Sequence, residues 1–329
     1  MRAGRRIIGA AIGMVAACAV VAPAGAAPDT RAEAATTSPQ IVRLAGQDRY
    51  ETAVKVSSYL NPAPIPDDEV TIVNGTAWPD ALAAANRYQT SRAVLLVQRN
   101  RVPEVTLREI KRLTPRRIVV IGGTGVIDSS VVRLLNPYAP DGAHRIAGSD
   151  RYKTTAGVVD SVFWGEEMMP LDHMVLATGE DWPDALTGAG LVPPLLLAGR
   201  DTLPWATIDA ARGQTVIAVG GTGAISDGVL NNIYLGNRDR TRIGGQDRYA
   251  TAAKVAAAIA SRRGGVQALW YASGENYSDA LAAAGAVVLL TRADCVPRAT
   301  DQATRNLGPE RIIVVGGPSV ANTSRVCRS

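Results

Sequence analysis

The sequence predicts an α/β fold of three tandem small modules, each a parallel sheet flanked by helices. Two observations predict it: two ordered motifs recur three times, and within each copy short apolar runs alternate with amphipathic stretches. Such alternation of strand and helix is typical of parallel strands joined by right-handed crossovers. The 329 residues are long enough for three modules that each bury a core.

The first 26 residues are typical of a secretory signal peptide. Three arginines within the first six residues precede an apolar stretch at residues 7–21, and small residues at 24–26 offer a cleavage site. We expect cleavage after Ala26 and no stable membrane insertion afterwards. Two alternatives stay open: a transmembrane anchor at the same stretch, and lipid attachment at Cys18, which ends a lipobox-like sequence.

Charge and cysteine content narrow the class of protein. Cleavage removes three of 35 basic residues, which leaves 32 against 30 acidic residues. That near-neutral balance disfavours a dedicated nucleic-acid binder, which would present a strong basic patch. Cleavage leaves Cys295 and Cys327 as an even pair in an exported chain, so we predict a disulfide that closes a loop of about 33 residues and contributes roughly 3 to 4 kcal/mol. Two buried free thiols are the alternative.

Ordered structure is expected to begin near residue 41, after an Ala/Thr/Ser-rich linker at residues 27–40. In the first module the short apolar runs predict buried strands, and the stretches with apolar residues three and four apart predict helices. The expected strands are residues 70–73, 94–97 and 118–121, and the expected helices are 48–60, 78–88, 103–113 and 128–135. The same order predicts modules at residues 41–138, 143–236 and 241–329.

Three sequence blocks define each module. The first block begins at Arg43, Arg145 and Arg242, which are 102 and 97 residues apart, and reads Arg, an apolar residue, Ala or Gly, Gly, any residue, Asp-Arg-Tyr, any residue, Thr. The second block covers residues 75–82, 179–186 and 274–281 and ends in Asp-Ala-Leu. The third is an apolar strand followed by Gly-Gly. The glycines favour a tight turn, because no Walker lysine or G-x-G-x-x-G pattern accompanies them.

The recurring aspartates of the first block are predicted helix caps. Asp48, Asp150 and Asp247 each precede an amphipathic stretch, where a carboxylate accepts from the free amides of the first turn. In the first copy Glu51 completes a capping-box pattern.

The next residue of each copy, Arg49, Arg151 or Arg248, stands at a helix start, where the helix dipole disfavours a cation. One hypothesis pairs it with the second-block aspartate of its own module, and the other directs it to a polyanionic ligand, because guanidinium groups suit phosphate and carboxylate. The second-block aspartates are Asp80, Asp184 and Asp279.

Arg43, Arg145 and Arg242 are expected on a short strand and give three similarly placed cations. If the modules surround a common axis, three equivalent sites result, and linked weak sites gain strongly from effective concentration on a repeating polymer. Bonds made within each module are the alternative role for these arginines.

Catalytic constellations are scarce. His144 and His173 are the two histidines, and neither recurs at the equivalent place of another module. The sequence therefore offers few residues for a histidine-based triad or a zinc site, and we expect no metal, no cofactor and no catalytic residues.

The combination of the three blocks resembles the cell wall binding repeat 2 family over residues 41–329. The resemblance implies three modules packed with pseudo-threefold symmetry that attach noncovalently to an anionic secondary polymer of the Gram-positive wall. It also implies ligand attachment at an Ile-Leu-Leu-like triplet, matched here by Val or Leu followed by two leucines. These pairs are Leu95 and Leu96, Leu196 and Leu197, and Leu289 and Leu290, which also fit a sheet core. The third copy departs most, with Tyr277, Ser278 and Pro318.

We therefore expect a secreted, cell-wall-associated binding protein. Its partner is an anionic wall glycopolymer, with peptidoglycan a further candidate, recognised without turnover. Two alternatives are a wall-remodelling hydrolase of the N-acetylmuramoyl-L-alanine amidase type and a surface adhesin with a protein partner.

Overall fold

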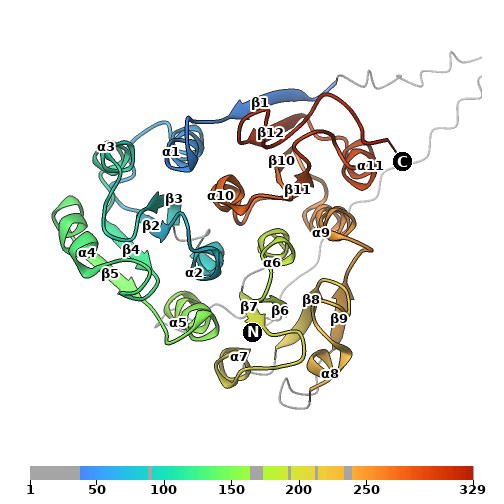
Figure 1. Cartoon of the computed structure of the whole chain (residues 1–329), viewed down its shortest axis with the longest axis horizontal. Helices are drawn as coiled ribbons and strands as arrows, with labels where there is room; N and C mark the ends of the chain where they lie inside the picture. The colour runs from blue at the N-terminus through green and yellow to red at the C-terminus, as the bar shows by residue number, and fades with distance from the viewer. Residues whose placement is uncertain are drawn as a thin grey trace, which may run out of the picture. The chain divides into compact units, whose positions relative to one another are not determined.

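Three four-stranded parallel sheets organise the described part of the chain (Figure 1). The computed structural model describes residues 38–87, 91–163, 173–191, 194–211, 214–232 and 239–328. Ser38–Ser329 forms one compact unit. The predicted signal peptide, Cys18 and most of the predicted linker lie outside the described residues. The three sheets with flanking helices confirm the predicted α/β fold of three modules.

The first module follows the predicted order closely. Its elements are β1 (Gln40–Leu44), α1 (Arg49–Leu60), β2 (Glu69–Asn74), α2 (Trp78–Ala81), the 3-10 helix η1 (Leu82–Arg87), β3 (Ser91–Val97), α3 (Glu104–Leu113), β4 (Arg117–Ile121), α4 (Ser129–Leu135) and the 3-10 helix η2 (Asn136–Tyr138).

The second module repeats this order with β5 (Ala143–Ile146), α5 (Arg151–Phe163), β6 (His173–Thr178), α6 (Pro183–Gly188), β7 (Leu195–Ala198), α7 (Trp205–Ala211), β8 (Thr215–Val219) and α8 (Asp227–Leu230). The third contains β9 (Arg240–Ile243), α9 (Arg248–Arg263), β10 (Ala268–Ser273), α10 (Tyr277–Ala280), the 3-10 helix η4 (Leu281–Ala283), β11 (Val288–Thr291), α11 (Arg298–Leu307) and β12 (Arg311–Val315).

One predicted helix takes a different form. The stretch at residues 78–88 is α-helical only over α2 and continues as the 3-10 helix η1. All six residues of η1 are buried. Asn86 also exchanges two hydrogen bonds with the backbone of Leu195 in the second module, at 2.9 and 2.6 Å. Packing against a neighbouring module therefore overrides the local helical pattern.

Each sheet takes its fourth strand from the following module. The strand orders are β3-β2-β4-β5, β7-β6-β8-β9 and β1-β12-β10-β11. Strand β5 pairs with β4, β9 pairs with β8, and β1 closes the cycle by pairing with β12, all in parallel. The first strand of every predicted module thus completes the sheet of the preceding one, and the three modules form a ring closed without a covalent bond between β1 and β12.

Helix contacts repeat in the same cyclic order. Helix α5 packs on η1 of the first module, α9 packs on α6 of the second, and α1 packs on η4 and α10 of the third. Figure 1 shows α2, α6 and α10 gathered at the centre of the three modules. One hydrophobic cluster contains buried residues of all three modules, so they share a core around this pseudo-threefold centre.

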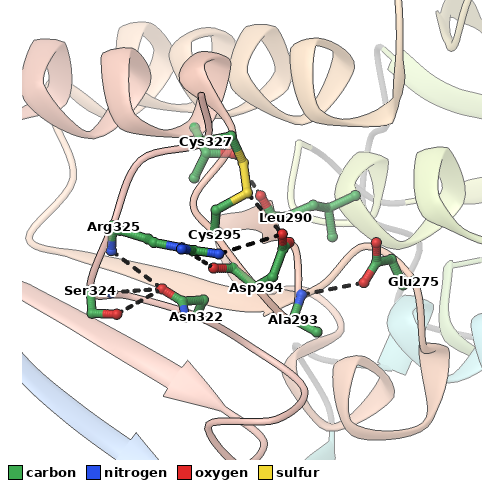
Figure 2. Close-up of a disulfide and its surroundings, with 10 residues drawn as sticks. Glu275, Leu290, Ala293, Asp294, Cys295, Asn322, Ser324, Arg325 and Cys327 are labelled. Atoms are coloured by element: carbon green, nitrogen blue, oxygen red, sulfur yellow. Dashed lines mark hydrogen bonds and ion pairs between the residues drawn. A yellow bond between two sulfur atoms is a disulfide. The ribbon is translucent and has the colours of Figure 1, made fainter. Parts of the chain in front are cut away.

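The disulfide between Cys295 and Cys327 is present (Figure 2). It joins the loop after β11 to the segment that follows β12. Among the described residues, no helix combines the length and the apolar character needed to cross a membrane.

The glycine turns after β4, β8 and β12 give a first prediction. At Gly220, after β8, φ is +114° and an added Cβ would lie 2.5 Å from Asp184 Oδ2 and 2.9 Å from Ala224 Cβ. Gly220→Ala should therefore lower the free energy of unfolding, measured by urea denaturation, by on the order of 1–3 kcal/mol. Gly223→Ala is the matched control, because nothing lies within 4 Å of its added Cβ. Equal midpoints for the two variants would contradict this account.

Candidate functional site

A cleft lies between the first and second modules. It has a volume of about 450 Å³, with backbone from the glycine turn after β4 on one side and the start of α5 on the other. The carboxylate of Asp80, from α2, faces the first turn of α5, where Asp150 and Arg151 stand. The lining residues are Ala77, Pro79, Asp80, Gly123, Thr124, Gly125, Val126, Gly148, Ser149, Asp150 and Arg151.

The junction between the second and third modules repeats this cleft. Its volume is about 500 Å³, and Asp184 of α6 faces Asp247 and Arg248 at the start of α9. Two further acids, Glu180 and Asp181, line this cleft. The other lining residues are Thr178, Pro183, Gly221, Thr222, Gly223, Ala224, Gly245, Gln246 and Thr251.

The junction between the third and first modules brings together the same types of residue. Asp279 of α10 interacts electrostatically with Asp48 and Arg49 at the start of α1 and hydrogen-bonds Thr52. A Cβ on Gly316, in the turn after β12, would lie 2.8 Å from Asp279 Oδ2. The glycine turn, the second-block aspartate and the Asp-Arg pair of the next module therefore meet at all three junctions.

Asp48, Asp150 and Asp247 cap helices α1, α5 and α9. Their carboxylates accept from the backbone amides of Glu51, Lys153 and Ala250 at 2.9, 2.8 and 2.7 Å. The Glu51 carboxylate accepts from the amide of Gln47 at 2.9 Å, so the reciprocal bond of the box reaches one residue before the cap. These caps fix the first turn of each helix at the edge of its cleft.

Arg151 and Arg248 reach across a module junction. Each donates to a carbonyl of its own module, that of Gly179 or Gly274, and each lies over an aromatic ring of the preceding module. The guanidinium of Arg151 is 5.1 Å from the ring centre of Trp78, and that of Arg248 is 6.0 Å from Trp182.

The hypothesis of an Arg–Asp pair within one module needs correction. The electrostatic partners lie across the junctions: Arg151 faces Asp80, Arg248 faces Asp184 and Arg49 faces Asp279. The reason is the strand exchange, which carries the first block of each module to the edge of the preceding sheet.

Arg43, Arg145 and Arg242 hold the exchanged strands. Arg43 Nη1 donates to the carbonyls of Gly316 and Ala321 at 2.8 and 3.0 Å, and Arg242 Nη1 donates to that of Gly220 at 3.0 Å. Arg145 donates to the equivalent carbonyl of Gly122. These arginines therefore bond the glycine turn of the preceding module, which corrects the predicted alternative of bonds within one module. Their contact with a ligand stays a prediction.

The leucine pairs lie in the sheet cores. All six have no exposed surface: Leu95, Leu96, Leu196, Leu197, Leu289 and Leu290. This burial favours the sheet-core interpretation, because a side chain without exposed surface presents nothing to a wall polymer.

The second-block carboxylates carry raised pKa values. Burial raises the pKa of the Asp184 carboxyl to about 6 from 3.8, the negative charge of Asp181 adds to the rise, and Arg248 opposes it. Burial likewise raises the pKa of Asp80 and Asp279, against hydrogen bonds from Thr154 and Thr52. Each junction thus holds a carboxyl group that prefers its neutral form more than a free aspartic acid does.

The role of the aromatic residue in each second block was not predicted from the sequence. Trp182 and Tyr277 contact edge to face at 6.4 Å between ring centres, and Tyr277 Oη donates to the carbonyl of Thr76 at 3.0 Å. These contacts join all three modules at the centre. The signal was the repeated Trp or Tyr three residues after the glycine of each second block.

Neither histidine lines the two clefts, although His144 lines a separate cavity with Glu69, Arg87 and Arg117. His144 is on β5 and contacts the carbonyl of Asp141 at 2.5 Å, and His173 begins β6. Within the described ranges, no group of three His, Cys, Asp or Glu residues could hold a metal ion.

Three segments of the chain match one protein family. Residues 43–132, 145–230 and 242–325 each match cell wall binding domain 2 (CWB2). The chain belongs to the CWB2 family. Its three modules are therefore cell-wall-binding modules, and the ring of exchanged strands is built from them.

Two curated relatives from Bacillus subtilis (strain 168) share this part of their sequence. The chain is 26% identical to N-acetylmuramoyl-L-alanine amidase LytC over 74% of this chain and 47% of the relative. It is 28% identical to an amidase enhancer over 84% of this chain and 38% of that protein. The chain thus spans less than half the length of either relative.

Two solved structures share the fold. Cwp6 from Clostridium difficile matches 88% of this chain and 49% of its own, with a TM-score of 0.73 and 23% identity. Cwp8 from the same organism matches 85% of this chain and 50% of its own, with a TM-score of 0.71 and 20% identity.

The raised pKa of Asp184 predicts a pH-dependent stability. An acid whose pKa is higher in the folded state binds its proton more tightly there, so its contribution to the free energy of unfolding falls as pH rises from about 4 to about 6 and is constant above. Asp184→Asn should remove this fall, worth on the order of 1–2 kcal/mol. Urea denaturation of both proteins at pH 4.5 and 7.5 measures it. A difference between them that is the same at both values would contradict the prediction.

Proposed function

We propose that this chain attaches noncovalently to the cell wall by binding an anionic glycopolymer, without turnover, at the three junctions between its CWB2 modules, two of which contain the clefts described above. The observation that carries the proposal is the recurrence of one set of groups at equivalent junctions. Each set contains an arginine, a mostly buried carboxylate and a glycine turn.

The chemistry of each cleft supports a glycopolymer. Arg151 and Arg248 offer guanidinium donors at the cleft edge, and the glycine turns bring backbone close to the open space. The aspartates offer acceptors for sugar hydroxyls. Donors and acceptors side by side fit a sugar that carries both hydroxyl and phosphate or carboxylate groups.

The charges around each cleft determine how well it can bind an anionic group of the polymer, and the two clefts differ in this respect. The cleft between the second and third modules contains four acids around Arg248, and Asp181 contacts that arginine at 3.3 Å. The cleft between the first and second modules contains Asp80 and Asp150 beside Arg151. An anion is therefore repelled less near Arg151, whereas sugar hydroxyls suit the more acidic cleft.

Triplication supports a repeating ligand. Three weak sites on one frame bind a polymer far more tightly than any one of them, because each further contact is intramolecular. In this proposal Arg49, Arg151 and Arg248 contact the polymer, while Arg43, Arg145, Arg242 and the six buried leucines maintain the frame.

Location follows from the same proposal. The signal peptide expected at residues 1–26 would export the chain, and wall binding would retain it outside the cell.

Substitution of Arg49, Arg151 and Arg248, which begin α1, α5 and α9 at the three junctions, tests the proposal. Arg49→Gln, Arg151→Gln and Arg248→Gln should each weaken cosedimentation with purified Gram-positive walls about tenfold, because a charge-assisted hydrogen bond is lost. The triple variant should lose at least about a hundredfold. Pelleting of the unaltered protein should weaken with salt and vanish from walls stripped of anionic polymers.

A triple variant of exposed arginines provides the matched control. Arg108, Arg116 and Arg305 lie on outer surfaces, and their change to Gln removes the same charge. Equal losses in both triple variants would indicate nonspecific attraction and contradict the cleft assignment. Unchanged pelleting with stripped walls would contradict an anionic ligand.

A zymogram tests the absence of turnover. The chain is similar to part of an amidase, and we propose that the shared part is the binding region. Incubation of the protein in gels containing peptidoglycan should leave no zone of clearing, with a wall amidase as positive control. Clearing that survives further purification would establish hydrolase activity instead.

A further inference from the structure

The junction between the third and first modules lacks a link that the first junction has. Helix α4 leads through residues 136–142 directly into β5, which pairs with β4. Strand β1, in contrast, pairs with β12 from the opposite end of the sequence, and Arg43 and its bonded Gly316 are 273 residues apart. Only noncovalent contacts hold β1 in its sheet.

The third module also replaces a helix with a cross-linked segment. Helices α4 and α8 follow the glycine turns of the first two modules, but the described residues after β12 contain no helix. The disulfide holds this segment through Cys327, and Val296 and Val326 form a parallel bridge beside it. Figure 2 shows this segment crossing the loop that contains Cys295.

The cross-linked segment in turn holds β1. Arg43, the fourth of the five residues of β1, donates to the carbonyls of Gly316 and Ala321 and to Thr323 Oγ1, the last at 3.4 Å. At the first junction, Arg145 of the second module donates to the carbonyl of Ile127, two residues before α4. The segment at residues 316–323 thus binds the arginine of β1 through backbone carbonyls, as the turn before α4 binds the arginine of β5.

We propose that the Cys295–Cys327 disulfide is a redox-sensitive latch that keeps β1 in the third sheet, so that its reduction opens the ring of modules at this one junction. A dithiol breaks the S–S bond and delivers two electrons and two protons. Two cysteine thiols form, and the dithiol closes to its own cyclic disulfide. The freed segment no longer fixes Ala321 and Thr323, two of the acceptors that bind Arg43, and β1 leaves the edge of its sheet.

Hydrogen exchange of the folded protein tests the latch. In the oxidised protein the amide of Gln40 donates to Glu310 and the amide of Gly316 donates to Leu44, which protects this pairing. Reduction with dithiothreitol under native conditions should raise the exchange rate of amides at residues 40–44 at least about tenfold. The amides of β5 and β9 should keep their rates. Unchanged rates in β1, or an equal rise in all three strands, would overturn the proposal.

Three variants identify the contacts through which the disulfide acts on β1. Arg43→Ala should speed exchange in β1 even when oxidised, and reduction should then add little, because the two changes act on the same contacts. Arg145→Ala, the equivalent change at the first junction, should leave the full effect of reduction on β1. Cys295→Ser with Cys327→Ser should reproduce the reduced protein. If reduction accelerates β1 equally in Arg43→Ala and in the unaltered protein, the latch does not act through Arg43 and the proposal fails.

Discussion

The exchange of one β-strand between consecutive modules is the constraint on which the rest of the structure depends. A parallel sheet of three strands leaves a row of backbone donors and acceptors at its edge, and the first strand of the next module satisfies them. Because that strand carries the first sequence block, its Asp-Arg pair arrives beside the glycine turn of the preceding module. Each cleft is therefore a product of two modules, and a single module would contain only half of it.

Packing at the centre reinforces this arrangement. Helices α2, α6 and α10 gather there (Figure 1), and Ala81, Ala185 and Ala280 on them are buried. Since one apolar cluster contains residues of all three modules, separating a module would expose core surface as well as a sheet edge. The shared core therefore connects the three modules in one compact unit, the kind of frame from which linked weak sites gain effective concentration.

The sequence predicted the secondary structure within each module but not the contacts between modules. Apolar runs gave the strands, the spacing of apolar residues gave most helices, and the caps at Asp48, Asp150 and Asp247 followed from position alone. The residue pattern of a strand does not indicate which strand it pairs with, so the exchange of strands between modules could not be predicted. The neighbours of Arg43 and Arg49 depend on that exchange and could not be predicted either. The prediction of one helix at residues 78–88 was wrong for a similar reason. It could not include the contact of Asn86 with the second module, where the chain forms the tighter 3-10 helix η1.

The mostly buried carboxylates at the three junctions cost the fold stability. A carboxylate whose pKa is raised by burial destabilises the folded protein at neutral pH relative to a neutral side chain of the same shape. Fold stability alone would favour asparagine at Asp80, Asp184 and Asp279, yet aspartate stands at all three. Each lies against a glycine turn and an arginine of the next module, beside open volume at two of the junctions. A carboxylate that costs stability is more easily explained by a role in binding than by a role in folding, and this agrees with the proposal that these junctions bind a wall polymer.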